Sequence, residues 1–274
     1  MADYPNYPKI SSMTMMAITI LFVTIVVGFL FKKYLDRRKT PALSLAYAFL
    51  LWDFAAIAVL IFAILHYIYD PIPGLVGEIQ YARYGINIGY AFSAMSNIMI
   101  VFFVSQIYAQ SPLFRRTQKA IPIFNSILNG VTIGMITDAI MHSLRPELID
   151  PLVKYNPQYP IGQTVYHLVL TVFAFLLLII LSARSRKQSL FKWEKAGFAF
   201  IMISGLSGLF VYVLFAFDLI IQFVPYFSTG YTIFQQIGWL CGVLMCIFGY
   251  AGYVMPQRLR NWYQAKEKEV TQNV

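Results

Sequence analysis

The sequence ALSLAYAFLLWDFAAIAVLIFAI, residues 42–64, is almost entirely apolar and carries a single charge, at Asp53. A helix rises about 1.5 Å per residue, so roughly 20 such residues cross the hydrocarbon core of a bilayer. Six other segments pass the same test. The predicted spans are residues 10–31, 42–64, 81–108, 120–141, 164–182, 196–221 and 230–254. The sequence therefore predicts an all-α membrane protein, a bundle of seven transmembrane helices.

The composition supports this class. Of the 274 residues, 59% are hydrophobic and only 12% are charged, whereas a soluble domain is about half apolar and about a quarter charged. This argues against a disordered chain and against a soluble enzyme. We expect one transmembrane domain over residues 1–257 and a short basic cytoplasmic tail over residues 258–274. Residues 1–9 lack a signal-peptide pattern, so we expect the first helix to be retained.

Basic residues fall mainly on one side of the predicted helices. Most of the 21 lysines and arginines lie in the connections 32–39, 115–119 and 184–195 and in the tail. Cytoplasmic loops of membrane proteins carry such an excess. We therefore expect the N-terminus outside, the C-terminus in the cytoplasm, and a multi-pass location in the cell membrane.

The net charge of +9 follows from this loop pattern and does not indicate a nucleic-acid partner, because no recognition helix or basic aromatic platform accompanies it. Residues 185–195 mix cations with Leu190, Phe191 and Trp193. This mixture suits the anionic lipid headgroups of the inner bilayer surface. Docking of a membrane or cytoplasmic protein partner is the alternative, and the oligomeric state is left open.

Small residues recur four positions apart on three of the predicted helices, which lets neighbouring backbones approach closely. The pairs are Gly85/Gly89, Gly130/Gly134 and Gly238/Gly242. Two of these stripes continue into polar residues at the same spacing, one through Ser93 and Asn97 and the other through Asp138 and His142. We expect both stripes to face the interior of the bundle.

Asp53 is the most unusual residue within a span, since it lies near the bilayer midplane, where a charge is costly. Ser93, Ser96 and Asn97 lie at comparable depth on the next helix and are its expected partners. The carboxyl group is then either neutral and hydrogen-bonded, a proton or cation site, or in contact with water. We interpret Asp53, Ser93 and Asn97 as a buried polar switch.

A second polar group gathers at the outer ends of the predicted helices. Its members are His66, Arg83, Asp138, His142, His167 and Asp218. Arg83 is a natural counter-ion for Asp138 or Asp218, which would make much of the group a structural ion-pair network. The sharper interpretation is an outward-facing pocket for a small polar ligand, closed by the proline-rich loop 142–163.

Metal binding is a further alternative for this outer group, because histidine nitrogen and carboxylate oxygen are common zinc ligands. A three-histidine site in seven helices would resemble the membrane hydrolases related to adiponectin receptors and alkaline ceramidases. Those proteins carry paired histidines on the last helix, and residues 230–254 contain none. We therefore predict no cofactor and leave the metal unassigned.

Three stretches carry a family resemblance. They are RRKTPA at 37–42 followed by Trp52, EIQYARY at 78–84, and GYAGYVMP at 249–256 before a basic tail. Together they resemble prokaryotic, archaeal-type seven-transmembrane sensor-like proteins, including the membrane region of some histidine kinases. The resemblance implies the seven-helix fold and a sensory role. Only twenty residues follow Val254, with no kinase or other output domain, so we expect a signal to leave through a separate partner.

The sequence as a whole favours a non-enzymatic sensor, receptor-like protein or binding subunit with an outward-facing polar pocket. A structural subunit of a membrane complex is one alternative. A small-solute or proton-coupled transporter centred on Asp53 is another, although the 13 prolines lie at helix ends or in loops, unlike those of many broken transporter helices. A metal-dependent membrane hydrolase is the least favoured.

Overall fold

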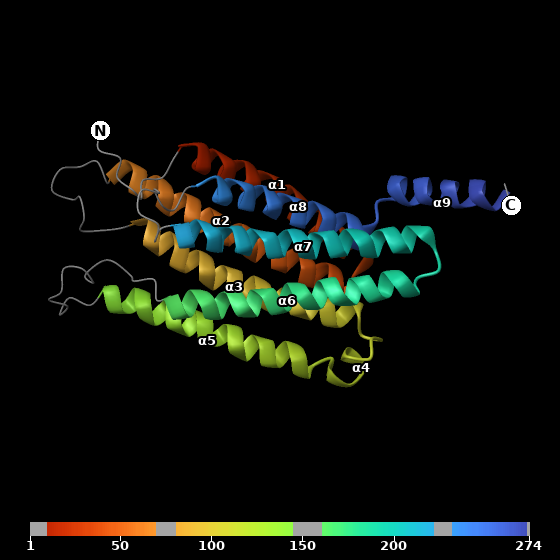
Figure 1. Ribbon diagram of the computed structural model, residues 1–274, viewed down its shortest axis with the longest axis horizontal. Coiled ribbons are helices and arrows are strands. Elements are labelled where there is room, and N and C mark those ends of the chain that lie inside the picture. The colour runs from red at the N-terminus through yellow and green to blue at the C-terminus, as the bar shows by residue number, and fades with distance from the viewer. Residues whose placement is uncertain (1–9, 70–80, 145–160, 222–231, 273–274) are drawn as a thin grey trace.

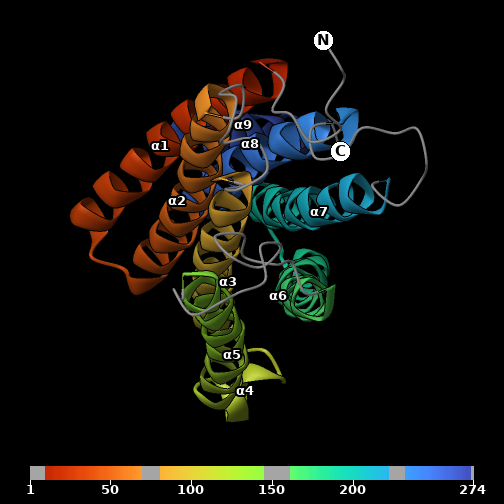
Figure 2. The same cartoon turned by 90° about the vertical axis from the view of Figure 1, so that its left-hand side faces the viewer.

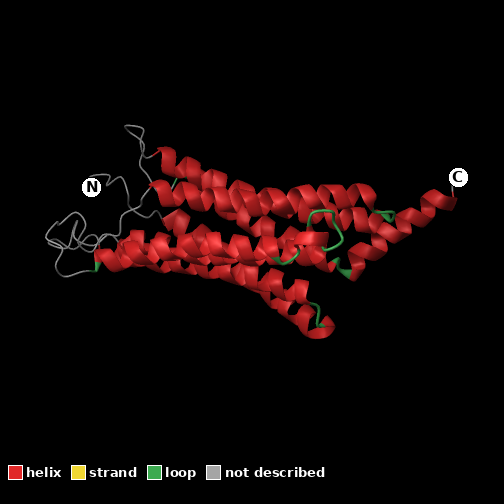
Figure 3. Ribbon diagram, turned by 90° about the horizontal axis from the view of Figure 1, so that it is seen from below, coloured by secondary structure: helices red, strands yellow, loops and turns green. Residues whose placement is uncertain are grey.

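The computed structural model describes residues 10–69, 81–144, 161–221 and 232–272, and most of these residues are helical (Figures 1 and 3). The long helices are α1 (Ile10–Arg37), α2 (Thr40–Tyr69), α3 (Tyr81–Ile107), α5 (Ala120–Ser143), α6 (Ile161–Gln188), α7 (Lys192–Ile221) and α8 (Ile233–Val254). Two shorter helices are α4 (Phe114–Thr117) and α9 (Gln257–Gln272). Within the described ranges, 7 helices are long and apolar enough to cross a membrane, which confirms the predicted fold class.

Several helices continue beyond the predicted apolar spans. Helix α1 runs to Arg37 and α6 to Gln188, so that the last turn of each helix contains basic residues. A helix stops where its backbone hydrogen bonds stop, whereas an apolar span is set by the thickness of the bilayer. At the other end of the bundle, most of the proline-rich loop 142–163 lies outside the described residues.

The long helices form a closed bundle (Figures 1 and 2). Helix α2 packs on α3, α3 on α6, α6 on α7, and α7 on α8. Helix α1 packs on both α2 and α8 and closes the ring. Helix α5 packs against α3 and α6 on the outside of this ring. The interior between α2, α3, α7 and α8 is therefore enclosed by helices and shielded from lipid on several sides.

Two of the three glycine pairs lie at close helix contacts, as predicted. A Cβ atom at Gly85 would lie 2.6 Å from Cβ of Phe62 on α2, and one at Gly238 would lie 2.5 Å from the Phe215 ring on α7. A Cβ at Gly242 would collide with the indole of Trp52. The absence of a side chain at these positions lets large aromatic side chains reach the middle of the bundle.

The third stripe faces the other way. Gly130, Gly134, Asp138 and His142 are all exposed on α5, and no other helix among the described residues comes within 4 Å of the Cβ positions of the two glycines. The expectation that this stripe faces inward is wrong. Helix α5 instead buries the neighbouring face, with residues Asn125, Asn129, Thr132, Ile136 and Ser143. The expectation is correct for α3, where Gly85, Gly89, Ser93 and Asn97 are buried.

The succession of antiparallel helices places the basic connections at one end of the bundle. That end carries α4, the α6–α7 turn and α9, and α9 extends beyond the bundle (Figure 1). The guanidinium carbon of Arg260 on α9 lies 4.3 Å from the centroid of the Trp193 ring at the start of α7. This cation–π contact joins the tail helix to the bundle.

The clustering of basic residues at this end yields a topology prediction. Leu144, at the end of α5, and Leu190, in the α6–α7 turn, are both exposed and lie at opposite ends of the bundle. We expect a membrane-impermeant maleimide to label Leu144→Cys in intact cells, and Leu190→Cys only after permeabilisation, because basic loops stay cytoplasmic. Each variant is the other's control, and the reverse pattern of labelling would contradict the orientation.

Candidate functional site

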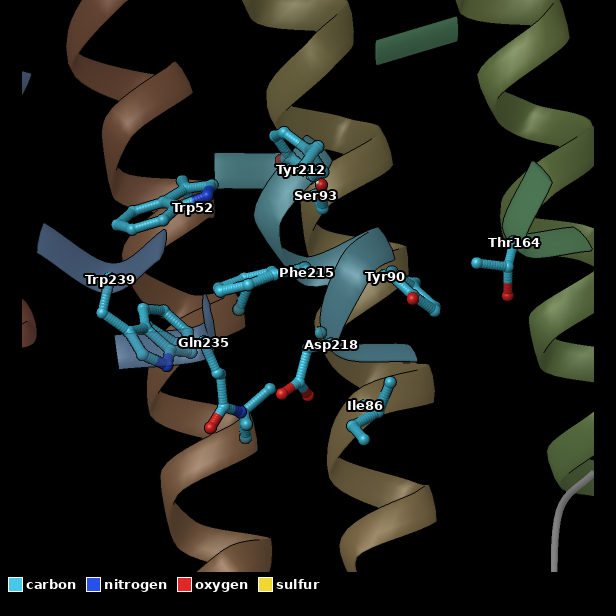
Figure 4. Close-up of a pocket in the computed structure, with 14 residues that line it drawn as sticks. Trp52, Ile86, Tyr90, Ser93, Thr164, Tyr212, Phe215, Asp218, Gln235 and Trp239 are labelled. Atoms are coloured by element: carbon cyan, nitrogen blue, oxygen red, sulfur yellow. Dashed lines mark hydrogen bonds between the residues drawn. The ribbon is translucent and has the colours of Figure 1, made fainter. Parts of the chain in front are cut away.

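A pocket opens inside the ring of helices, between α2, α3, α7 and α8, with Thr164 of α6 at one side (Figure 4). It holds about 900 Å³ of empty space, including its open mouth. The pocket runs from Trp52, in the middle of α2, toward Asp218 and Gln235 near the end of the bundle opposite the basic loops. Its lining therefore reaches the end of the bundle that the charge pattern predicts to face the exterior.

Aromatic side chains form much of the pocket wall. Five of the lining residues are Trp52, Tyr90, Tyr212, Phe215 and Trp239. The Trp239 ring centroid lies 5.7 Å from that of Trp52 and 5.1 Å from that of Phe215, and both pairs are tilted. Such tilted contacts stabilise the rings against one another.

Asp218 connects α7 to α8 at one end of the pocket. This buried side chain accepts a hydrogen bond from the backbone N–H of Thr232 at 3.0 Å, and a second from the Thr232 hydroxyl. The same hydroxyl accepts the Phe234 N–H at 3.2 Å and so caps the first turn of α8. Asp218 therefore holds the end of α7 to the start of α8, with its carboxyl group at the pocket (Figure 4).

A polar network lies behind the wall of the pocket. The Ser93 hydroxyl lies 2.5 Å from the Tyr212 hydroxyl and 3.0 Å from Nε2 of His167. One turn further along α3, the Asn97 amide donates to the Thr171 hydroxyl at 2.7 Å, and that hydroxyl donates to the His167 carbonyl at 2.9 Å. The network joins α3, α6 and α7 at mid-depth, and Ser93 and Tyr212 also line the pocket.

Asp53 does not join this network. Its Oδ2 accepts a hydrogen bond from the Thr24 hydroxyl of α1 at 2.7 Å, and its Oδ1 has no partner within the part of the chain that the structure describes. The Ser96 hydroxyl, an expected partner, donates instead to the Ala48 carbonyl at 2.7 Å. Successive residues point about 100° apart on a helix, so while Trp52 faces the pocket, Asp53 faces α1. The expected partnership is therefore wrong: Ser96 lies opposite Ala48, more than one turn of α2 before Asp53, and the sequence did not show which face each residue occupies.

The outer polar group is only partly assembled. Asp218 reaches the mouth of the pocket and His167 lies just behind its wall, but Asp138 and His142 are exposed on the far side of α5. His66 is buried near the end of α2, and Arg83 is half-buried on α3, where its carbonyl accepts the Asn87 amide at 2.9 Å. Among the described residues no three His, Cys, Asp or Glu side chains gather as metal ligands.

The sequence did not single out the aromatic lining as a site. Tyr90, Tyr212, Phe215 and Trp239 occur at ordinary helical spacing, and this pattern is typical of any buried core. The one available signal was glycine, because Gly238 and Gly242 leave room for Phe215 and Trp52. Thr24 is likewise a single hydroxyl in an apolar stretch, so the sequence did not predict its contact with Asp53.

Comparison with known proteins identifies no relative, since no family model, curated protein or solved structure matches the chain.

The polar network yields a stability prediction. Tyr212→Phe removes one hydroxyl from the buried Ser93–Tyr212 pair, so we expect a loss of about 1–2 kcal/mol of stability. Tyr47→Phe is the control, because Tyr47 is exposed on α2. The measurement is thermal unfolding of both variants in the same detergent. Equal midpoints for Tyr212→Phe, Tyr47→Phe and the unaltered protein would show that the pair contributes nothing.

Proposed function

We propose that this multi-pass membrane protein binds a small molecule in the aromatic pocket and acts as a sensor, receptor-like protein or binding subunit. The observation that carries the proposal is the pocket itself. Ligand sites are typically concave, mainly apolar, and provided with a few convergent polar groups. Here aromatic rings surround the cavity, while Ser93, Thr164, Asp218 and Gln235 supply the polar groups.

Unfulfilled hydrogen-bonding capacity at the pocket supports the same function. Two buried polar atoms of lining residues, Nε1 of Trp239 and Oε1 of Gln235, have no partner among the described residues. A buried polar group without a partner costs roughly 1–3 kcal/mol. A bound molecule or ordered water that reached these atoms would remove that cost.

Ser93 and His167 resemble a nucleophile and its base, with 3.0 Å between Oγ and Nε2, and this makes a hydrolase the second candidate. In such pairs a third group usually orients the base, but none of the described residues bonds to Nδ1 of His167. Ser93 also lies inside α3, where backbone N–H groups bond to carbonyls one turn earlier instead of forming an oxyanion hole. The arrangement therefore favours binding over covalent catalysis.

The experiment is native mass spectrometry of protein extracted gently from its own membrane. We expect a discrete added mass on the unaltered chain. Ala55→Phe, which adds a ring to the pocket lining, should lose this mass, while Ala17→Phe on the exposed face of α1 should retain it. Thermal unfolding checks that both variants fold. A bare unaltered protein, or the same added mass on folded Ala55→Phe, would contradict the proposal.

A further inference from the structure

The pocket lining carries charge of one sign only. Asp218 is the one acidic residue among the described residues that line the pocket, and no lysine, arginine or histidine is among them. The Asp218 side chain is 6% exposed. A carboxylate in such surroundings disfavours anionic ligands and favours cations, because the low local dielectric strengthens both effects.

The hydrogen bonds of Asp218 do not cancel its charge. Both come from neutral groups of Thr232, the backbone N–H and the hydroxyl. The carboxyl group lies between the end of α7, where helix dipoles place partial negative charge, and the start of α8, where they place partial positive charge. These two partial charges oppose each other, so the formal charge of the carboxylate dominates the mouth of the pocket.

The aromatic wall adds a second attraction for the same kind of ligand. Trp239 is tilted by 56° to Trp52 and by 59° to Phe215, so the three rings do not stack and their faces point in different directions. Tyr90 and Tyr212 line the pocket from α3 and α7 (Figure 4). Ring faces attract cations, most strongly for tryptophan, and most of all where water is excluded.

We propose that the pocket binds an organic cation with a compact ammonium group, held between the carboxylate of Asp218 and the ring faces of Trp52, Trp239 and Phe215. This inference rests on the proposed ligand-binding function and names the class of ligand. A quaternary ammonium group fits both the carboxylate and the rings, since it has no N–H group that needs an acceptor and its diffuse charge is only weakly hydrated. The ammonium belongs either to a free solute or to a lipid headgroup.

The test is equilibrium binding of radiolabelled choline to the full chain in phosphatidylglycerol nanodiscs, which carry no ammonium headgroup of the choline type. The neutral competitor is 3,3-dimethylbutan-1-ol, which has the shape of choline without its charge. We expect choline to bind at least about tenfold more tightly than this alcohol. Repeating the measurement with phosphatidylcholine in the nanodisc distinguishes the two sources. If the lipid competes with choline, the site belongs to a lipid headgroup; if it does not compete, the site belongs to a free solute.

A set of variants distinguishes the effect of losing the charge from the effect of unfolding. Asp218→Asn keeps an oxygen for the two Thr232 hydrogen bonds and removes only the charge, so we expect an unchanged melting temperature and about a tenfold weaker choline affinity. Asp36→Asn, at the exposed basic end of α1, is the matched control and should bind as the unaltered protein does. Phe215→Leu should weaken binding, whereas Phe210→Leu, exposed on the same helix, should not.

The cation inference is overturned if the neutral alcohol binds as tightly as choline, if neither binds, or if folded Asp218→Asn binds choline unchanged. None of these results decides the proposed function. A ligand found by mass on the unaltered chain and lost in Ala55→Phe would still establish the pocket as a binding site for a different class of molecule.

Discussion

The hydrocarbon core of a bilayer offers no hydrogen-bond partner, so each polar group within it must be satisfied by the protein itself. The helices meet this requirement for the backbone, and several buried side chains meet it by bonding across helix contacts. Tyr108 and Ser182 lie 2.6 Å apart between the end of α3 and α6, and the Ser204 hydroxyl donates to the Met245 carbonyl of α8 at 2.6 Å. These bonds fix neighbouring helices at one depth and one rotation.

This requirement is not fully met at the pocket. On its inner side the Ser93 hydroxyl contacts both Tyr212 and His167, while at the other end Asp218 accepts hydrogen bonds from Thr232. Trp239 and Gln235 also line the pocket, and each has a buried polar atom without a partner among the described residues. Glycines on α8 allow the surrounding rings to converge there. Close packing thus builds the walls of the cavity, and these two polar atoms are ones that the proposed ligand would reach.

How far the sequence predicts the structure depends on the kind of information each feature needs. The helices were predictable, because length and apolar content are properties of one segment at a time. Their ends were less so, since α1 and α6 continue through basic turns that no bilayer constraint limits. The position of a residue along its helix could also be predicted, and Asp218 was correctly placed near one end of the bundle.

Rotation about the helix axis was not readable from one sequence. The stripe through Gly130 and Asp138 shows that these residues share a side, but not whether that side meets another helix. The same lack of information explains the wrong partner for Asp53. Its carboxyl group bonds to Thr24 of α1 and not to Ser96, the expected partner. The aromatic lining was hidden for another reason, because tryptophan and tyrosine are as common in an ordinary core as in a binding site.

The most direct measurement of the central claim is an experimental structure of the protein extracted gently from its own membrane. The account predicts density for a bound molecule between the Trp52 and Trp239 rings and the Asp218 carboxyl group, with the helices arranged as described here. A cavity that is closed by collapsed aromatic side chains, or that holds only ordered water, would contradict the claim that this protein is built around a ligand.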